Sequence, residues 1–285
     1  MTDAELKAFV DEQGGLATAA QIITAFDRPR FERAVADGQV RRVARGRYAT
    51  YAVDSARDAA VSLTGVVSGL SAAQWWDWEV KRQPERPVVT VPRNRSVRRD
   101  GVVVQRRDLP EGAVVDGIVL SKAETVVDCA RSLPFDEALA VADSALRDPT
   151  VTRAELVRAA DASPRWGRAK VQRVVGLADA RADNPFESCV RAIALDVPGL
   201  TLVPQVQVDN VGWADLVDVH LRIVVECDSW AFHSGPDLFR RDVRRYTDMV
   251  RRGWLVVRFV WEDVTGRPDR VRDVLTQVAR LRLSE

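Results

Sequence analysis

The sequence has few cysteines and no long hydrophobic run. No stretch reaches the roughly 18 uncharged apolar residues that a membrane-spanning helix needs, and the acidic N-terminus lacks the basic and then apolar build of a signal peptide. Three cysteines, Cys129, Cys189 and Cys227, are odd in number and far apart, which argues against both a disulfide framework and a zinc site. These absences predict a cytoplasmic protein with no membrane partner.

Common nucleotide-binding and catalytic motifs are also missing. The sequence contains no Gly-x4-Gly-Lys-Ser/Thr loop, no His-Glu-x2-His pair, no Gly-x-Ser-x-Gly and no dinucleotide fingerprint. We therefore expect no nucleotide cofactor. Nucleotide-driven, zinc-protease, serine-hydrolase and redox functions are set aside as leading options.

The chain is long enough for more than one domain. It has 285 residues, of which 46% are hydrophobic and 29% charged, as is typical of a globular protein with a sizeable core. Composition changes divide it into blocks at 1–52, 53–150, 151–183 and 184–285. We expect an α/β multi-domain protein with an α+β middle domain in the second block, a helical linker in the third and a separate α/β domain in the fourth.

Positive charge is concentrated in two segments, although the net charge of the chain is only +1. Residues 28–50 hold seven arginines against two acidic residues, and residues 81–109 hold nine basic against three acidic residues. Local basic patches are typical of proteins that bind phosphate backbones. The alternative is a coding bias that favours arginine everywhere, but clustering favours functional patches.

The first block reads as three short helices followed by a hairpin. Thr18 is expected to cap the second helix, and residues 28–37 form a third helix that ends near Gly38. Residues 40–48 alternate around a tight turn, as a two-stranded wing does. This order predicts a winged helix-turn-helix that binds DNA; the alternative is a small helical cap with a solvated basic face. The expected DNA-binding residues are Arg30, Arg33, Arg41, Arg42, Arg45 and Arg47.

Short motifs run through the first half of the chain, beginning with QGGLAT at 13–18 and VRRVARGRYA at 40–49 and continuing at 70–73, 89–93 and 125–130. In these motifs the sequence resembles AbiEi-type antitoxins of bacterial type IV toxin–antitoxin systems. The resemblance implies an antitoxin-like middle domain, DNA binding and regulation of its own operon. It leaves a cognate toxin protein open as a partner, because this domain is also found fused to other modules.

An aromatic cluster, Trp75-Trp76-Asp77-Trp78, lies in the middle block. Aromatic side chains can stack on nucleic-acid bases. Clusters of this kind more often pack a helix into a core. We therefore expect these residues to pack within the middle domain.

The fourth block alternates between helical and strand patterns in the order αβββαβα. Asn184 or Asp183 can cap a first helix, with Pro185 in its first turn. Three strand-like segments follow, separated by short turns. The expected elements are a helix to about 196, strands at 201–208, 213–219 and 222–228, a helix at 236–251, a strand at 254–261 and a helix at 270–283.

Carboxylates lie within these expected strands. Asp215 is in the second strand, and Glu226 and Asp228 are two residues apart in the third, so the latter two share one face. Glu187 is in the first turn of the leading helix. Carboxylates in apolar strands are costly unless they are paired or bind a metal, and converging oxygen ligands suit Mg²⁺ or Mn²⁺. We predict a metal site held by Asp215, Glu226 and Asp228 that could activate water at a phosphodiester.

Several short motifs occur on these elements in order. They are NPFES at 184–188, ADL at 214–216 and VVECDS at 224–229, followed by His233 and the segments 239–245 and 253–259. They resemble the PD-(D/E)xK nuclease superfamily, and more closely its branch of very short patch repair endonucleases. The resemblance implies a restriction-endonuclease-like αβββαβ domain.

By position in the family's motif, Asp215 corresponds to the metal-binding aspartate and Glu226 to the (D/E) residue. Asp228 occupies the position of the motif's lysine, so the sequence departs from the family pattern there. The branch also lacks the lysine and uses a histidine, which His233 matches, and Glu187 matches the glutamate of its helix. The implied catalytic residues are Glu187, Asp215, Glu226, Asp228 and His233.

The same residues have structural alternatives. Glu226 and Asp228 could be ion-pair partners of Arg240 or Arg244, which are otherwise expected to contact DNA phosphates from the long helix. Asp218 is an odd number of residues from Asp215 and is expected to face the opposite side of the sheet.

The leading hypothesis is a Mg²⁺-dependent DNA endonuclease or nickase that is targeted by its own winged helix. The rival is a non-catalytic repressor or antitoxin whose nuclease fold has lost activity, which the missing lysine favours. An RNA-processing enzyme stays open as a third possibility, because the phosphodiester chemistry is the same.

Overall fold

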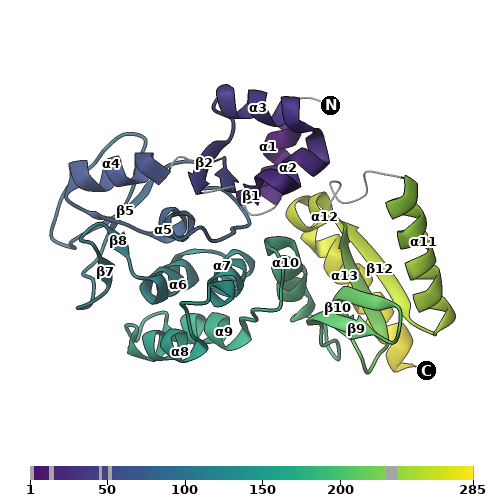
Figure 1. The fold of residues 1–285 in the computed structure, drawn as a ribbon. Coiled ribbons are helices and arrows are strands. Elements are labelled where there is room, and N and C mark those ends of the chain that lie inside the picture. The colour runs from purple at the N-terminus through teal and green to yellow at the C-terminus, as the bar shows by residue number, and fades with distance from the viewer. Residues whose placement is uncertain (1–2, 13–15, 45–46, 51–52, 229–235, 285) are drawn as a thin grey trace. The chain divides into compact units, whose positions relative to one another are not determined.

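In the computed structural model the chain forms a mixed α/β protein (Figure 1). It divides into two compact units, Met1–Ala178 (unit 1) and Asp179–Glu285 (unit 2). None of the helices that the structure describes is long and apolar enough to cross a membrane. The described residues are 3–12, 16–44, 47–50, 53–228 and 236–284.

Unit 1 begins with three helices and a three-stranded antiparallel sheet of order β1-β3-β2. Thr18 caps α2, as expected, in a capping box in which its side chain accepts from Gln21 N and the Gln21 side chain accepts from Thr18 N. Asp27, with a left-handed φ of 84°, caps α3. The elements are α1 (Asp3–Glu12), β1 (Leu16–Thr18), α2 (Ala19–Phe26), α3 (Arg28–Ala36), β2 (Arg41–Ala44) and β3 (Arg47–Ala49).

The middle of unit 1 contains a five-stranded mixed sheet of order β6-β5-β4-β8-β7. Gly65 precedes β4 where the backbone runs closest to β5, since an added Cβ would lie 2.6 Å from Val89 Cγ1 and 2.8 Å from the Thr90 carbonyl oxygen. Only glycine fits there without a shift. The elements are α4 (Val53–Leu63), β4 (Val66–Val67), α5 (Gly69–Trp75), β5 (Val88–Val91), β6 (Val103–Arg106), β7 (Val114–Val115), β8 (Val119–Leu120), α6 (Lys122–Ser132) and α7 (Phe135–Arg147).

The last two helices of unit 1 are α8 (Arg153–Ala162) and α9 (Arg168–Leu177). They pack against each other, α8 and α9 both contact α6, and α9 also contacts α7. Residues 151–183 were expected to form a linker; these helices instead belong to unit 1. The physical reason is their apolar stripes, with Leu156, Val171 and Val174 fully buried, because an amphipathic helix is stable only when that stripe is covered.

Unit 2 has a four-stranded mixed sheet of order β12-β11-β10-β9, in which only β11 and β12 are parallel. The expected order of a helix, three strands, a helix and a strand is present, and Asn184 rather than Asp183 is the cap of the first helix. A short helix after the last strand was not anticipated. The elements are α10 (Pro185–Ala194), β9 (Val203–Val208), β10 (Gly212–Asp218), β11 (Ile223–Asp228), α11 (Pro236–Arg251), β12 (Leu255–Val260), α12 (Trp261–Gly266) and α13 (Pro268–Leu283).

The sheet of unit 2 has a core on each face. On β11, Val225 packs with residues of α10 and α13, whereas its neighbour Val224 packs with Met249 of α11. On β10 this alternation breaks, since Ala214 and Leu216 are two residues apart yet lie in different cores. The register of β10 with β9 pairs Ala214 with Val206 and Leu216 with Pro204 and omits Asp215 between them. The irregularity therefore falls on a residue that the sequence predicts to hold a metal.

Candidate active site of unit 2

Glu187 is held at the start of α10 by a network of hydrogen bonds. Its carboxylate accepts from Asp183 N at 3.0 Å, from Asn184 Nδ2 at 3.0 Å and from Gln205 Nε2 at 3.2 Å. Gln205 lies in β9 with a left-handed φ of 50°. The Glu187 side chain is almost fully buried, with 1% of its surface exposed. A buried carboxylate with fixed partners is rigidly oriented.

Asp215 connects the two central strands of the sheet. Its Oδ2 accepts a hydrogen bond of 2.8 Å from Cys227 N, just beyond Leu216 and Val225, where the pairing of β10 with β11 ends. A side chain thus replaces the backbone ladder where the strands separate. Asp218, at the other end of β10, accepts from Thr201 N and Leu221 N and so has a structural role in two turns.

Glu226 and Asp228 both pair with arginines that the sequence did not predict as their partners. Arg245 of α11 donates to Glu226 Oε2 at 3.0 Å, and Arg258 of β12 donates to Asp228 Oδ2 at 2.6 Å. Tyr246 OH lies 3.5 Å from Asp228 Oδ1. The other oxygen of Glu226, Oε1, is buried and has no hydrogen-bond partner among the described residues.

The arginines that the sequence suggested as partners, Arg240 and Arg244, are exposed on α11. Arg245, Tyr246 and Arg258 were not predicted as partners of these carboxylates. Arg258 reaches this site through the parallel pairing of β11 and β12, which puts it in register with Glu226. That pairing is a tertiary fact which the sequence pattern does not contain.

Burial and mutual repulsion raise the pKa values of three of these carboxyl groups. Burial, aided by the charge of Asp215, raises the pKa of Glu187 to about 8. Burial is the larger cause and the charge of Asp215 the second cause that raise the pKa of Glu226 to about 7, whereas Arg245 acts to lower this pKa. Burial also raises the pKa of Asp215 itself. Ionising all of these carboxyl groups together is therefore unfavourable.

The donor set suits a hard divalent cation in one respect. A buried oxygen without a partner, as at Glu226 Oε1, is costly and would be satisfied by a cation. The arginines, however, already neutralise Glu226 and Asp228. No group of three or more His, Cys, Asp or Glu residues in the part of the chain that the structure describes is arranged to hold a metal ion. His233, expected in this site, lies outside the described residues.

The arginines predicted to bind DNA in unit 1 lie on α3 and on the β2-β3 hairpin. Arg33 and Arg42 are exposed, and Arg30 is half-buried. Arg41 and Arg47 are on β2 and β3 respectively. Arg45 lies outside the described residues.

Comparison with known proteins gives relatives but no function. No family model matches the chain. Two proteins of Mycobacterium tuberculosis, Uncharacterized protein MT2308 of strain CDC 1551 and Uncharacterized protein Rv2248 of strain H37Rv, are each 32% identical to it over 161 residues. The match covers 54% of this chain and 59% of each relative, so the chain spans less than two thirds of their length.

Proposed function

We propose that the protein is a DNA-binding, metal-dependent phosphodiesterase, with a PD-(D/E)xK-type endonuclease or nickase domain in unit 2. The observation that carries this proposal is the set of interacting carboxylates Glu187, Asp215 and Glu226, which come from a helix and two adjacent strands. They repel one another, and one oxygen of Glu226 is buried without a partner. Buried acidic groups that destabilise one another are typical of sites built for catalysis.

The roles of the residues follow from their surroundings. Asp215, Glu226 and Asp228 would hold Mg²⁺ or Mn²⁺, which supplies positive charge to offset the charge that develops on a scissile phosphate. Glu187, with a pKa of about 8, retains a proton near neutral pH and is our candidate proton donor. Arg245 and Arg258 hold Glu226 and Asp228 in place and provide guanidinium groups for a phosphate.

For the N-terminal part of unit 1, we propose a winged helix-turn-helix that delivers the chain to DNA. The order of helices followed by a β2-β3 hairpin supports this assignment. Five arginines at described positions, Arg30, Arg33, Arg41, Arg42 and Arg47, lie on α3 and the hairpin. These are the elements through which such domains contact bases and phosphates.

A second candidate is a non-catalytic regulator of the repressor or antitoxin type. It is favoured by the pairing of Glu226 with Arg245 and of Asp228 with Arg258, which supplies internally the positive charge that a metal would otherwise supply. In this case unit 2 serves as a surface for a protein partner such as a cognate toxin, and unit 1 binds DNA without cleavage.

Incubation of the purified full chain with supercoiled plasmid separates the two candidates. The enzyme should convert plasmid to nicked or linear forms with Mg²⁺ or Mn²⁺ and not with a chelator. Single-stranded DNA, methylated DNA and RNA should be tested in parallel. Absence of metal-dependent cleavage on every substrate, with DNA binding retained, identifies the regulator.

A further inference from the structure

A basic surface lies in the middle of unit 1, on the connection between the parallel strands β5 and β6. Parallel strands are usually joined through a helix, but this connection, residues 92–102, contains none. It runs beside α4, which packs against β5 (Figure 1). Four basic residues of the segment 81–109 lie on it, namely Arg93, Arg95, Arg98 and Arg99. The proposed winged helix does not include this segment, so its charge has no assigned role.

Arg95 and Arg99 attach the connection to α4. Arg95 Nη1 donates to the carbonyl oxygen of Thr64, directly after the end of α4, at 3.0 Å. Arg99 Nη1 donates to the Asp58 carbonyl oxygen at 3.3 Å and to Ser62 Oγ. The last carbonyl groups of a helix have no partner within it, and their partial negative charge favours a cation. The fold therefore holds both guanidinium groups in place.

Arg106, at the end of β6, holds the start of the connection. It donates from Nε to the Arg95 carbonyl oxygen at 3.2 Å and from Nη2 to the Val97 carbonyl oxygen at 2.9 Å. The parallel register places Arg106 opposite Val91, the residue that precedes the connection. Arg95, Arg99 and Arg106, here called the loop arginines, thus belong to one small network of hydrogen bonds.

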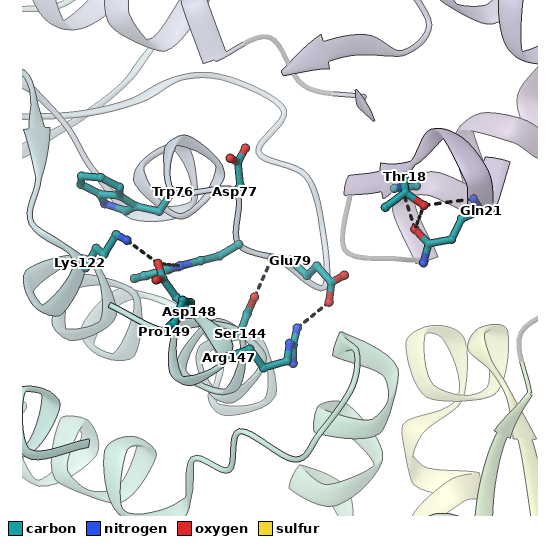
Figure 2. Close-up of a pocket in the computed structure, with 12 residues that line it drawn as sticks. Thr18, Gln21, Trp76, Asp77, Glu79, Lys122, Ser144, Arg147, Asp148 and Pro149 are labelled. Atoms are coloured by element: carbon teal, nitrogen blue, oxygen red, sulfur yellow. Dashed lines mark hydrogen bonds and ion pairs between the residues drawn. The ribbon is translucent and has the colours of Figure 1, made fainter. Parts of the chain in front are cut away.

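The loop arginines have no acidic partner among the residues that the structure describes. Figure 2 shows the opposite case at the cavity beside Trp76, where the Lys122 ammonium is paired with Asp148. There the positive charge is neutralised within the fold. The loop arginines are held by neutral oxygens instead, so their charge is available to an anion outside the chain.

Each loop arginine keeps N–H groups that the fold does not use. Arg95 and Arg99 donate only from Nη1, and Arg106 donates only from Nε and Nη2. Arg99 and Arg106 are exposed. Arg95 is half-buried, and its unbonded nitrogen atoms are accessible to solvent. The surface therefore presents oriented donors rather than flexible side chains.

Two neighbouring arginines extend this surface. Arg93 lies 3.8 Å from Asp108 and Arg98 lies 3.8 Å from Asp100, and all four side chains are at least 69% exposed. Exposed pairs of this length contribute little free energy, so an anion can displace them at small cost. These carboxylates lower the net charge of the surface but leave the loop arginines unneutralised.

We propose that the loop arginines bind the phosphate backbone of duplex DNA, as a second contact in addition to that of the winged helix. The inference rests on the DNA binding proposed above for unit 1. Guanidinium groups bind phosphate oxygens through paired hydrogen bonds, and groups that are already oriented lose less conformational entropy on binding. The connection contains no aromatic residue that could stack on bases, so this contact positions DNA without reading its sequence.

Fluorescence anisotropy of labelled duplexes with the full chain tests the proposal. The double variant Arg95→Gln with Arg99→Gln should weaken duplex binding by about tenfold and lower its salt dependence by about two units of slope, one for each lost phosphate contact. The loss should be the same on duplexes of unrelated sequence. Circular dichroism and urea unfolding establish that the variant is folded.

Two further double variants separate this contact from general effects of charge and folding. Arg158→Gln with Arg165→Gln removes the same charge from exposed positions of unit 1 and should leave binding nearly unchanged. Arg95→Lys with Arg99→Lys keeps the charge and should recover most of the salt dependence, although lysine does not form the paired hydrogen bonds. Poly-L-glutamate, tested in parallel, reports binding of an acidic protein.

The outcomes distinguish this inference from the proposed function. If wild type binds duplex DNA and the two glutamine variants bind it equally well, the second contact does not exist, while DNA binding by the hairpin stands. If the Arg95 and Arg99 variant loses binding of poly-L-glutamate but not of DNA, the surface takes an acidic protein and the inference is wrong. Absence of duplex binding by wild type overturns both.

Discussion

Arg245 and the buried Glu226 form an ion pair between α11 and β11, with Arg245 Nη2 3.0 Å from Glu226 Oε2. The same guanidinium donates from Nη1 to the Trp213 carbonyl oxygen at 2.7 Å. Arg245 therefore connects the long helix to two strands of the sheet. It also leaves the second oxygen of Glu226 without a partner, so the pair orients this carboxylate without completing its hydrogen bonding.

Replacing Asp215 distinguishes catalysis from contamination. Asp215→Asn keeps an oxygen that can accept from Cys227 N but removes the charge that would hold a cation. We expect plasmid cleavage to fall by about 100- to 1,000-fold, the usual loss for one electrostatic element of an active site. DNA binding measured by gel shift should be unchanged. Asp248→Asn on the exposed side of α11 is the control; equal residual cleavage by both variants would show that another nuclease is present.

His233 is predicted to take part in proton transfer. His233→Ala should slow cleavage by about 100-fold or more if the imidazole is a general acid or base, and less if it only positions phosphate. The pH profile of the cleavage rate separates these roles. Loss of a general acid or base changes the shape of the profile, whereas loss of a phosphate contact lowers the rate at every pH.

The raised pKa of Glu187 makes unit 2 less stable at alkaline pH. Its pKa is about 8 in the folded protein against 4.5 for the unfolded chain. The stability that the protonated Glu187 side chain contributes to folding is therefore fully present below about pH 4.5 and is lost as the pH rises through 8. Glu187→Gln, which cannot ionise, should raise the melting temperature at pH 9 relative to wild type and change it less at pH 5. A larger gain at pH 5 than at pH 9 would contradict this assignment.

The β2-β3 hairpin is predicted to contact phosphates. Combined replacement of Arg41, Arg42, Arg45 and Arg47 by alanine should weaken duplex binding and flatten its salt dependence, by about one unit of slope for each lost phosphate contact. A control variant that replaces the exposed Arg158 and Arg165 by alanine should have little effect for each charge removed. If fluorescence anisotropy gives the same affinity and slope for the hairpin variant as for wild type, the hairpin does not bind DNA.

Two glycines of unit 1 should respond oppositely to alanine. Gly65→Ala places a methyl group 2.6 Å from Val89 Cγ1 and 2.8 Å from a backbone oxygen, and overpacking of this kind costs about 1–3 kcal/mol. Gly176→Ala, at an exposed position of α9 with open space around it, should be neutral or stabilise by up to about 1 kcal/mol. Urea unfolding measures both, and equal free energies of unfolding would refute the close approach at Gly65.

Much of the fold of unit 2 could be predicted from the sequence, because its signals are local. Helical and strand periodicities identified the order of elements, and Asn184 with Pro185 marked the start of α10. The same holds for Thr18 at the start of α2. A cap satisfies backbone N–H groups only a few residues away, so it is readable from neighbouring residues. The carboxylates could be assigned to strands for the same reason.

Tertiary structure alone decided the partners of those carboxylates. Arg245 and not Arg244 reaches Glu226, because the rotation of α11 about its axis is set by packing of Met249 and Tyr246 against the sheet. Arg258 reaches Asp228 because β12 pairs in parallel with β11. The break in alternation at Asp215 and the cavity beside Trp76 also depend on contacts between distant segments. Such contacts have no period in the sequence, so the sequence determined which groups are present and the packing determined which of them meet.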